Sequence, residues 1–371
     1  MFTQTMVSTS TELERKLIER INREGPITFR DFMQAALYDP ELGYYNTSRL
    51  KIGAAGDYYT SSNVHPAFGA VLAQAFIDLW VEYPLTLVEI GAGTGQLAFD
   101  ILSAVRDENP GVFASLTYII VESSLYMIEH QKERLESFGD RVRWCEVQEL
   151  ERAPIQGIAF SNEFVDAMPV HRIRRRDGGV EEQYVTVSSG SGEHGEMRLR
   201  LDWGELSTER LSDYAAGMDV TLTEGQVVEA NLEALRWLAR MSRAISHGFL
   251  VTIDYGDTVQ RLWTPDRKQG TLRCFHEHHL IDSPLERIGE QDMTASVNFT
   301  ALIDYGRDFG FQFVSLERQT AFLIRMGLID RIASANQPGQ SLDDLKERLA
   351  VKNLFVPGGI SDSFRVLVQR R

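Results

Sequence analysis

Residues 87–97 read Leu-Val-Glu-Ile-Gly-Ala-Gly-Thr-Gly-Gln-Leu, an apolar run followed by three alternating glycines. The pattern predicts a buried strand, a tight turn and the start of a helix. Glycine lets the backbone approach a ligand closely and adopt positive φ without a Cβ penalty. A dinucleotide fingerprint needs its third glycine one position later, and a P-loop needs Lys followed by Ser or Thr. Neither phosphate cradle is therefore predicted here.

Short apolar runs alternate with helical patterns on both sides of this segment. Because strands that are apolar on both faces and joined by helices form parallel sheets covered on both sides, we expect an α/β fold. The expected strands are Leu85–Ile90, Thr117–Glu122, Val142–Val147, Gly157–Asn162, Phe249–Asp254, Phe311–Glu317 and Phe364–Gln369. The expected helices are near Gln96–Arg106, Leu125–Phe138, Gly225–Ser246 and Thr300–Phe309.

Helix-start signals mark the N-terminal part of the chain. Thr11 with Glu14 can form a capping box, Thr28 can cap a second helix, and Pro66 stands at the start of a third. Two later insertions follow the carboxyl ends of strands, where open α/β sheets bind ligands. We divide the chain into an N-terminal helical and flap region (1–83), a core (84–169 and 225–371) and the insertions (170–224 and 255–299), which are expected to form a substrate-binding subdomain.

The charge balance and the cysteines narrow the class of protein. The chain has 371 residues, of which 53 are acidic and 38 are basic, for a net charge of −15. Because contacts to phosphate backbones come from Lys and Arg, no nucleic-acid partner is expected. Cys145 and Cys274 lack metal-ligand spacing, so no metal is predicted. His171 and the run Arg172–Arg176 are expected on the exposed face of a strand.

Targeting and membrane signals are not seen in the sequence. No apolar run approaches the roughly 18 residues that a membrane-spanning helix needs. The opening MFTQTMVSTS has neither the basic start of a secretory signal nor the arginines of a transit peptide. We therefore expect a soluble, cytoplasmic protein without a membrane partner. Whether it forms a homodimer is left open.

Two acids flank the glycine turn, because Glu89 precedes it and Glu122 ends the next strand. The E-x-G-x-G-x-G pattern resembles the first motif of S-adenosylmethionine-dependent methyltransferases with a Rossmann-like sheet. The resemblance implies that Gly91, Gly93 and Gly95 pack under the methionine part of S-adenosyl-L-methionine. It also implies that Glu122 accepts hydrogen bonds from the ribose hydroxyls, and that Glu89 orients the turn or the cofactor's ammonium. The alternative is a structural strand–helix turn.

Six further motifs occur in a fixed order and closely resemble the MidA-like methyltransferases. That family includes the mitochondrial complex I assembly factor that symmetrically dimethylates an arginine on a core subunit. The resemblance implies a seven-stranded class I methyltransferase sheet with an N-terminal helical extension and two substrate-site insertions. The motifs are Asp39–Tyr45, Gly53–Thr60, Asn162–Pro169, Ile253–Gly256, Gly270–Arg273 and Asp292–Phe299.

An arginine acceptor poses a chemical problem, because its guanidinium stays protonated and delocalised. Carboxylates that grip it through two hydrogen bonds can localise its charge and direct one nitrogen to the methyl group. Glu163 stands at the carboxyl end of the expected fourth strand and is assigned as the main orienting carboxylate, with Asp166 as a second. Asn162 would contact cofactor or acceptor through its amide. The alternative for both acids is to cap the following helix.

Two more groups of residues are expected near the site. The glycines of Gly53–Thr60 suit close approach to a ligand, and Asp57 and Thr60 offer polar contacts, so this segment is interpreted as a flap over the cofactor. A structural turn is the alternative. Asp254 and Tyr255 end the fifth strand and are expected to face the acceptor, unless the tyrosine hydroxyl is bonded to backbone.

Three functions compete on this basis. The leading hypothesis is a methyltransferase that acts on an arginine of a protein substrate. The second is an O- or N-methyltransferase with a small-molecule acceptor. It is favoured by the aromatic loop that contains Tyr58–Tyr59, by Ala92 and Thr94 in place of the family's Pro and Arg, and by the divergent C-terminal segment Leu354–Phe364. The third is an assembly chaperone that binds the cofactor without turnover.

Overall fold

The computed structural model describes residues 11–47, 66–82, 84–188, 197–277, 279–329, 331 and 363–371. The predicted flap residues Gly53, Asp57 and Thr60 lie outside these described residues. Within the described ranges, no helix combines the length and the apolar character required to cross a membrane.

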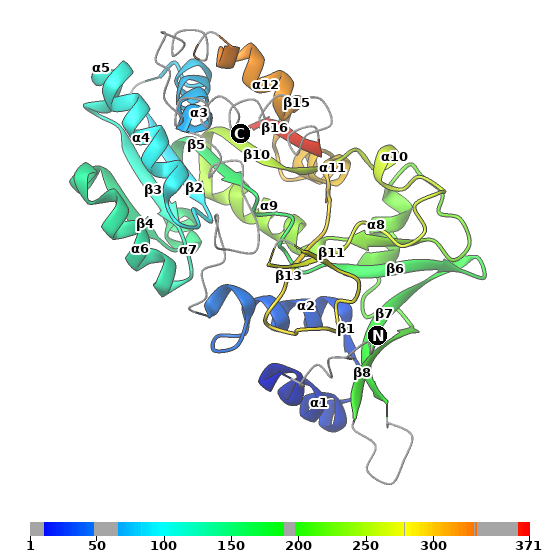
Figure 1. The fold of residues 1–371 in the computed structure, drawn as a ribbon. Coiled ribbons are helices and arrows are strands. Elements are labelled where there is room, and N and C mark those ends of the chain that lie inside the picture. Colours follow the sequence, from blue (N-terminus) through cyan, green and yellow to red (C-terminus); the bar gives the residue numbers. More distant parts are fainter. Residues whose placement is uncertain are drawn as a thin grey trace, which may run out of the picture.

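A mixed eight-stranded sheet forms the centre of the structure (Figure 1). Its strands are β2 (Thr86–Ile90), β3 (Thr117–Val121), β4 (Val142–Cys145), β5 (Ile155–Asn162), β10 (Ile245–Asp257), β14 (Val297–Asn298), β15 (Gln312–Arg318) and β16 (Phe364–Arg370). The order is β15-β16-β10-β5-β2-β3-β4, and β14 pairs with β10. The pairs from β10 to β4 are parallel, whereas β16 is antiparallel to both of its neighbours.

Each strand expected from the sequence is present, and β10 is longer at both ends than predicted. The expectation of a parallel sheet is wrong for β16, and β14 brings the strand number to eight rather than seven. An apolar run indicates burial on both faces, but its composition does not indicate the direction in which the strand runs.

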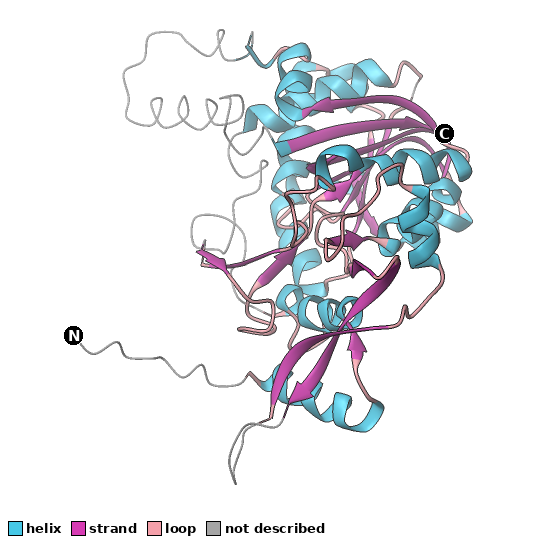
Figure 2. Ribbon diagram, turned by 90° about the vertical axis from the view of Figure 1, so that its right-hand side faces the viewer, coloured by secondary structure: helices cyan, strands magenta, loops and turns pink. Residues whose placement is uncertain are grey.

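Helices cover both faces of the sheet and close a hydrophobic core on each side (Figure 2). One side carries α3 (Pro66–Leu79), α4 (Gln96–Glu108) and α6 (Leu125–Leu135), and the other carries α7 (Val147–Arg152), α9 (Leu232–Ala244) and α11 (Phe299–Asp308). Alternate residues of β2 enter opposite cores, because Leu87 packs in the first and Val88 in the second. This alternation explains why the strand is apolar on both faces, with Glu89 as a buried exception.

The predicted helix over Gly225–Ser246 is wrong at its N-terminal end. The chain first forms the short strand β9 (Val227–Ala230), and α9 begins only at Leu232. The side chain of Asn231 caps α9 by accepting a hydrogen bond from the N–H of Ala234 at 2.8 Å. The N-cap residue Asn231 therefore marks the boundary between β9 and α9, which the pattern of apolar residues alone did not separate.

The N-terminal helices start where the sequence predicts. Thr11 caps α1 (Glu12–Glu24) by accepting from the N–H of Glu14, and Thr28 caps α2 (Phe29–Tyr38) in the same way. Both helices pack against a second sheet, which lies below the central sheet in Figure 1. That sheet contains β1 (Ile27–Thr28), β6 (His171–Arg176), β7 (Gly179–Ser188), β8 (Arg198–Gly204) and β9.

The expected exposure of His171 and the run Arg172–Arg176 is wrong for the first three residues, His171, Arg172 and Ile173. His171 is buried, with Nδ1 2.7 Å from Oε1 of Glu182. Arg172 is also buried, and it donates to the side chain of Gln183 and to the backbone oxygen of Gln269. Because Gln269 belongs to the second insertion, Arg172 ties that insertion to the second sheet.

Residues 255–299 contribute a third, three-stranded sheet in the order β12-β11-β13. Its strands are β11 (Arg273–His276), β12 (His279–Ile281) and β13 (Asp292–Thr294).

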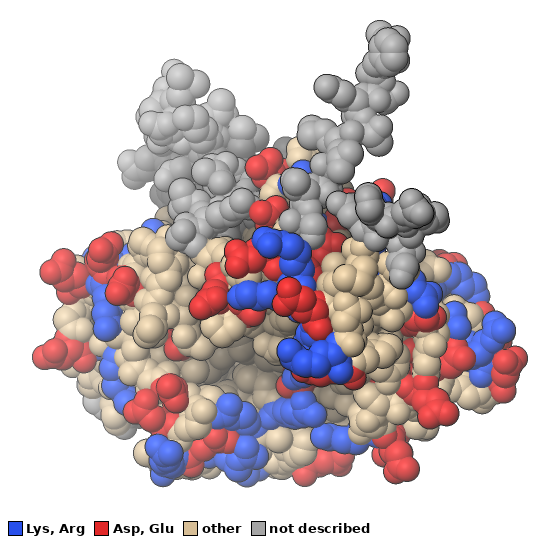
Figure 3. All heavy atoms as spheres, turned by 90° about the horizontal axis from the view of Figure 1, so that it is seen from below, with Lys and Arg blue, Asp and Glu red and all other residues tan. Residues whose placement is uncertain are grey.

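On the face shown in Figure 3, Lys and Arg side chains are interspersed with Asp and Glu. Ion pairs such as those of Arg240 and Arg243 with Glu151 show how close the two signs lie.

Candidate active site

The glycine turn between β2 and α4 needs glycine at all three alternating positions. Gly91, Gly93 and Gly95 have φ values of 68°, 53° and 75°, in the left-handed region that side chains disfavour. At Gly91 the space is also occupied, because a Cβ there would lie 2.7 Å from Cδ2 of Phe164. The turn is thus fixed in shape and touches the segment that follows β5.

Glu122 follows β3 beside this turn. Its Oε1 accepts backbone hydrogen bonds from Ser123 and Ser124 at 2.8 and 3.0 Å, and its Oε2 accepts one from the side chain of Gln131 at 3.3 Å. Burial raises the pKa of Glu122, and these hydrogen bonds partly offset that effect. The carboxylate is therefore held in one orientation.

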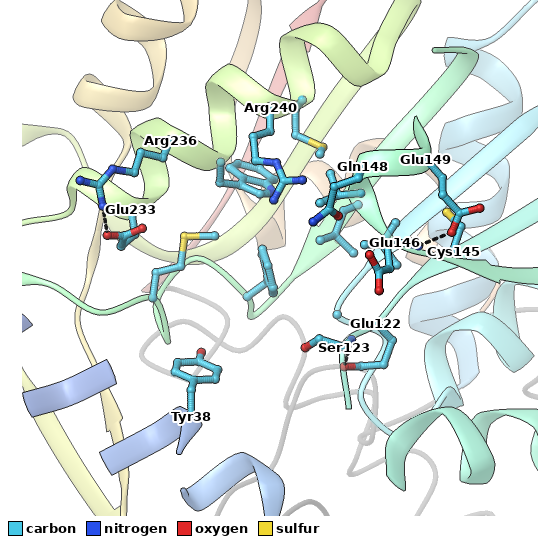
Figure 4. A pocket seen from close by; sticks show the side chains of 18 of the residues that line it. Tyr38, Glu122, Ser123, Cys145, Glu146, Gln148, Glu149, Glu233, Arg236 and Arg240 are labelled. Carbon is cyan, nitrogen blue, oxygen red and sulfur yellow. Dashed lines mark hydrogen bonds and ion pairs between the residues drawn. The ribbon is translucent and has the colours of Figure 1, made fainter. Parts of the chain in front are cut away.

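A cavity of about 730 Å³ opens beside the glycine turn and Glu122 (Figure 4). The ends of β2, β3 and β4 form one side, and α2 and α9 form the other. Figure 4 shows Glu122 and Glu146 on one side, with Tyr38 and Glu233 across from them. This volume lies within the range of small-molecule and cofactor pockets.

The end of β4 supplies cavity residues that the sequence reasoning missed. Trp144, Cys145 and Glu146 all line the cavity. The available signal was the acid directly after an apolar strand, since the carboxyl ends of parallel strands meet at one edge of the sheet. Arg236 and Arg240 of α9 also line the cavity, and no local pattern indicated them.

Glu89 lies within the core of the sheet and is almost fully buried. The hydroxyl of Tyr118 donates a hydrogen bond to its Oε2 at 2.6 Å. Burial raises the pKa of Glu89 to about 7, although the Tyr118 hydrogen bond acts in the opposite direction. A carboxyl group at this place supports the strand end that carries the glycine turn.

The turn after β5 holds Glu163 in an unusual backbone conformation. Its φ is 53°, which costs a residue with a side chain of order 1–3 kcal/mol. The side-chain amide of Asn162 donates to Oε1 of Glu163 at 3.3 Å, and the N–H of Glu163 donates to the backbone oxygen of Ile253 at 2.9 Å. The two predicted residues are thus brought together at the carboxyl end of β5.

The side chain of Asp254 stabilises the turn after β5. It is fully buried, and its Oδ2 accepts the backbone N–H groups of Phe164, Val165 and Asp166 at 3.2, 2.9 and 3.3 Å. Burial, with a contribution from the nearby charge of Glu163, raises the pKa of Asp254 to about 7. The structure therefore places Asp254 behind the turn, with its carboxylate occupied by backbone donors.

Motifs far apart in the sequence converge on Asp166. The side chain of Asp166 is buried, and burial together with Asp254 and Asp292 raises its pKa well above the usual range. Its backbone oxygen accepts from the N–H of Ala295 at 3.0 Å, and Asp292 accepts from the hydroxyl of Tyr45 at 2.8 Å. The first, third and last of the six motifs thus meet at one place.

Tyr255 follows Asp254 and is half-buried. Its ring lies 5.8 Å from that of Phe364, between ring centres, in an edge-to-face arrangement. Burial and the nearby carboxylate of Asp166 raise the pKa of Tyr255 well above its usual range.

Among the described residues, no group of three His, Cys, Asp or Glu side chains is placed to hold a metal ion.

Together, a glycine turn, an acid after the next strand and an adjoining cavity define an α/β protein with a site for a nucleoside cofactor. The family model described as "Putative S-adenosyl-L-methionine-dependent methyltransferase" matches residues 71–315, more than half of the chain. The chain belongs to this family, and S-adenosyl-L-methionine is its cofactor. The residues present fit that cofactor, since Gly91 of the glycine turn and the fixed carboxylate of Glu122 both line the cavity.

Relatives and solved structures agree with this assignment. The chain is 28% identical to a Drosophila melanogaster protein named protein arginine methyltransferase NDUFAF7 homolog, mitochondrial, over 77% of this chain and 68% of that protein. It is 27% identical to the Danio rerio NDUFAF7 protein, over 89% and 81%. A Burkholderia thailandensis protein titled "likely methyl transferase" and solved with S-adenosyl-homocysteine has a TM-score of 0.84 and 26% identity, over 97% of this chain and 92% of that one. The names of the first two place them in mitochondria, so they give the predicted cytoplasmic location no support.

Proposed function

We propose that this methyltransferase transfers a methyl group to an arginine of a protein substrate. The observation that carries the proposal is the contact between the glycine turn and the turn after β5, where a Cβ on Gly91 would meet Phe164. Glu163 is the residue directly before Phe164. A carboxylate that can accept from a guanidinium therefore adjoins the part of the site that holds the cofactor. The names of the relatives, which are protein arginine methyltransferases, also support the proposal.

The residues divide the work as follows. Gly91, Gly93 and Gly95 would hold the methionine part of the cofactor, and Glu122 would accept from the ribose hydroxyls. When bound, S-adenosyl-L-methionine supplies the electrophilic methyl group. Glu163 would grip the guanidinium of the acceptor, concentrate its charge on one side and direct the opposite nitrogen toward the cofactor.

Four further residues act around that carboxylate. Asn162 holds the Glu163 carboxylate through its amide, as the 3.3 Å hydrogen bond indicates. Asp166 is the second carboxylate that we propose for the acceptor site, because a bound cation would offset the burial and the like charges of Asp254 and Asp292 that raise its pKa. Asp254 fixes the backbone of the turn, and we assign it and the adjoining Tyr255 to shaping the acceptor site.

The two insertions would form the substrate-binding subdomain. Helix α2 packs against the second sheet, and its residue Tyr38 lines the cavity. The hydroxyl of Tyr38 donates to the backbone oxygen of Ala167 at 3.0 Å, directly beyond the turn that carries Glu163. A protein substrate would thus be received between the second sheet and the carboxyl ends of β5 and β10.

A small-molecule acceptor is the second candidate, and the size of the cavity favours it. The cavity continues past the cofactor side to Tyr38, Met168 and Arg240, which leaves room for a compact acceptor. The cytoplasmic location stays a prediction, and the oligomeric state stays open.

The test is the identity of the methylated product. The purified chain is incubated with methyl-labelled S-adenosyl-L-methionine and a cell extract, and peptides are analysed by mass spectrometry. The proposal predicts label in methylarginine. Label found only in a small metabolite would overturn it in favour of the second candidate. A bound cofactor without transfer would favour an assembly chaperone.

A further inference from the structure

The side chain of Gln131, on α6, links the ends of three neighbouring strands. It is completely buried, and its Nε2 donates to the backbone oxygen of Gly93 at 2.8 Å and to Oε2 of Glu122 at 3.3 Å. Its Oε1 accepts from the indole Nε1 of Trp144 at 2.8 Å. Both N–H groups of this amide and one lone pair of its oxygen are therefore in use around the cofactor side of the cavity.

The orientation of the Gln131 amide is fixed by chemistry. An indole N–H can only donate, so the atom that faces Trp144 must be the amide oxygen. The amide NH₂ must then face Gly93 and Glu122, both of which present acceptors. A flipped amide would place an oxygen against a carbonyl and a carboxylate and would leave the indole without an acceptor.

Gln131 also touches the glycine turn through its carbon atoms. A Cβ on Gly95 would lie 3.2 Å from Cγ of Gln131, so α6 packs directly on the turn. Gln131 is absent from the cavity lining, whereas its partners Glu122 and Trp144 both line it. Any influence on a ligand must therefore pass through those partners.

We propose that Gln131 is a positioning residue that sets the glycine turn and the Glu122 carboxylate in one arrangement for recognition of the cofactor's ribose. The inference rests on the ribose role proposed above for Glu122. Since Oε1 of Glu122 is taken by two backbone donors, Gln131 determines where the lone pairs of Oε2 point. A neutral donor does this without neutralising the carboxylate, which keeps its charge for the hydroxyls of the ligand.

The experiment compares S-adenosylhomocysteine with its 2′,3′-dideoxy analogue by titration calorimetry. The wild-type chain is expected to bind the parent about 10-fold or more tightly than the analogue, the effect of a hydrogen bond to a charged group. In Q131M, parent affinity should fall about 10-fold, and the ratio between the two ligands should shrink to within about threefold. Q131E keeps the shape and an acceptor for Trp144 but replaces the NH₂ donors by a second carboxyl group against Glu122, and it should show the same compressed ratio.

Two controls separate positioning from folding. L135A removes a buried apolar side chain on the same helix and should lower the melting temperature without changing the ligand ratio. A wild-type ratio in a folded Q131M or Q131E would overturn the inference. The variant E122Q tests the role of Glu122 separately from that of Gln131. If the affinity ratio of the two ligands is lost in E122Q but kept in Q131M, only the role of Gln131 is contradicted. A ratio near one in the wild type contradicts the role of Glu122 and, with it, that of Gln131.

Discussion

The carboxylate of Asp254 accepts the backbone N–H of Val165 at 2.9 Å and thereby joins the end of β10 to the turn that follows β5. The same oxygen receives the N–H groups of the two adjacent residues. Glu163 begins this turn with a positive φ, so the conformation that presents its carboxylate is maintained by a buried acid on another strand.

D254N should therefore lower turnover while leaving cofactor binding nearly intact. Replacing one carboxylate oxygen by an NH₂ group sets a donor against backbone donors, a cost of about 1–3 kcal/mol. We expect kcat to fall between about 5-fold and 150-fold and the Kd for S-adenosylhomocysteine to change less than threefold. D308N, at the exposed C-terminal end of α11, serves as the matched control. An equal loss of cofactor affinity in D254N would contradict this assignment.

G91A should abolish cofactor binding, because the added methyl group meets Phe164 and the backbone is left-handed. We expect a loss of stability of about 2 kcal/mol or more, measured by denaturant unfolding. The double variant G91A/F164L should recover part of the stability by relieving the contact. G111A is the control, since a Cβ there meets no atom within 4 Å. Normal ligand binding by G91A would disprove the predicted cradle.

E89Q should make stability less dependent on pH. Burial raises the pKa of Glu89 to about 7, above that of a glutamate in an unfolded chain. The folded state therefore binds more protons between about pH 4.5 and 7, and stability falls as the pH rises through that window. Between pH 5 and 8, E89Q should gain about 2–3 kcal/mol relative to the wild type. The exposed substitution E19Q should not show this change, and parallel pH profiles of wild type and E89Q would refute the prediction.

Y45F tests the convergence of the motifs at Asp166. The variant removes the hydroxyl that donates to Asp292 and should cost about 1–3 kcal/mol, because a buried carboxylate loses a donor. Turnover should decline with stability, since Asp292 lies close enough to Asp166 to influence its ionisation. Chemical unfolding and initial rates measure the two effects. Unchanged values for both would show that this contact does not support the site.

Local sequence patterns were sufficient to predict the positions of most strands and of the glycine turn. In β2, both faces are apolar because both are buried, and each turn glycine has a positive φ. The antiparallel direction of β16 was not predictable, because it depends on pairing with β10 and β15. The error at Gly225–Ser246 arose because β9 is buried, α9 has an apolar face, and only Asn231 separates the two elements.

The candidate site was predictable only where its residues lie at strand ends. Glu122 and Glu163 could be found in this way, whereas Gln131 acts from the buried side of a helix and forms its hydrogen bonds through space. The arrangement of Asp254 behind the Glu163 turn likewise depends on the register between β5 and β10. Such contacts are set by packing and carry no local sequence signature.

The central claim is that Glu163 orients the acceptor arginine. Its most direct test is methylarginine formation by E163Q under single-turnover conditions, quantified by mass spectrometry on the protein substrate that the wild-type enzyme methylates. E317Q, on the edge strand β15 and away from the site, is the matched control. The account predicts that E163Q loses about 100-fold or more in rate while it binds S-adenosylhomocysteine as the wild type does. Methylarginine formed by E163Q at the wild-type rate would contradict the role of Glu163 and the proposed chemistry.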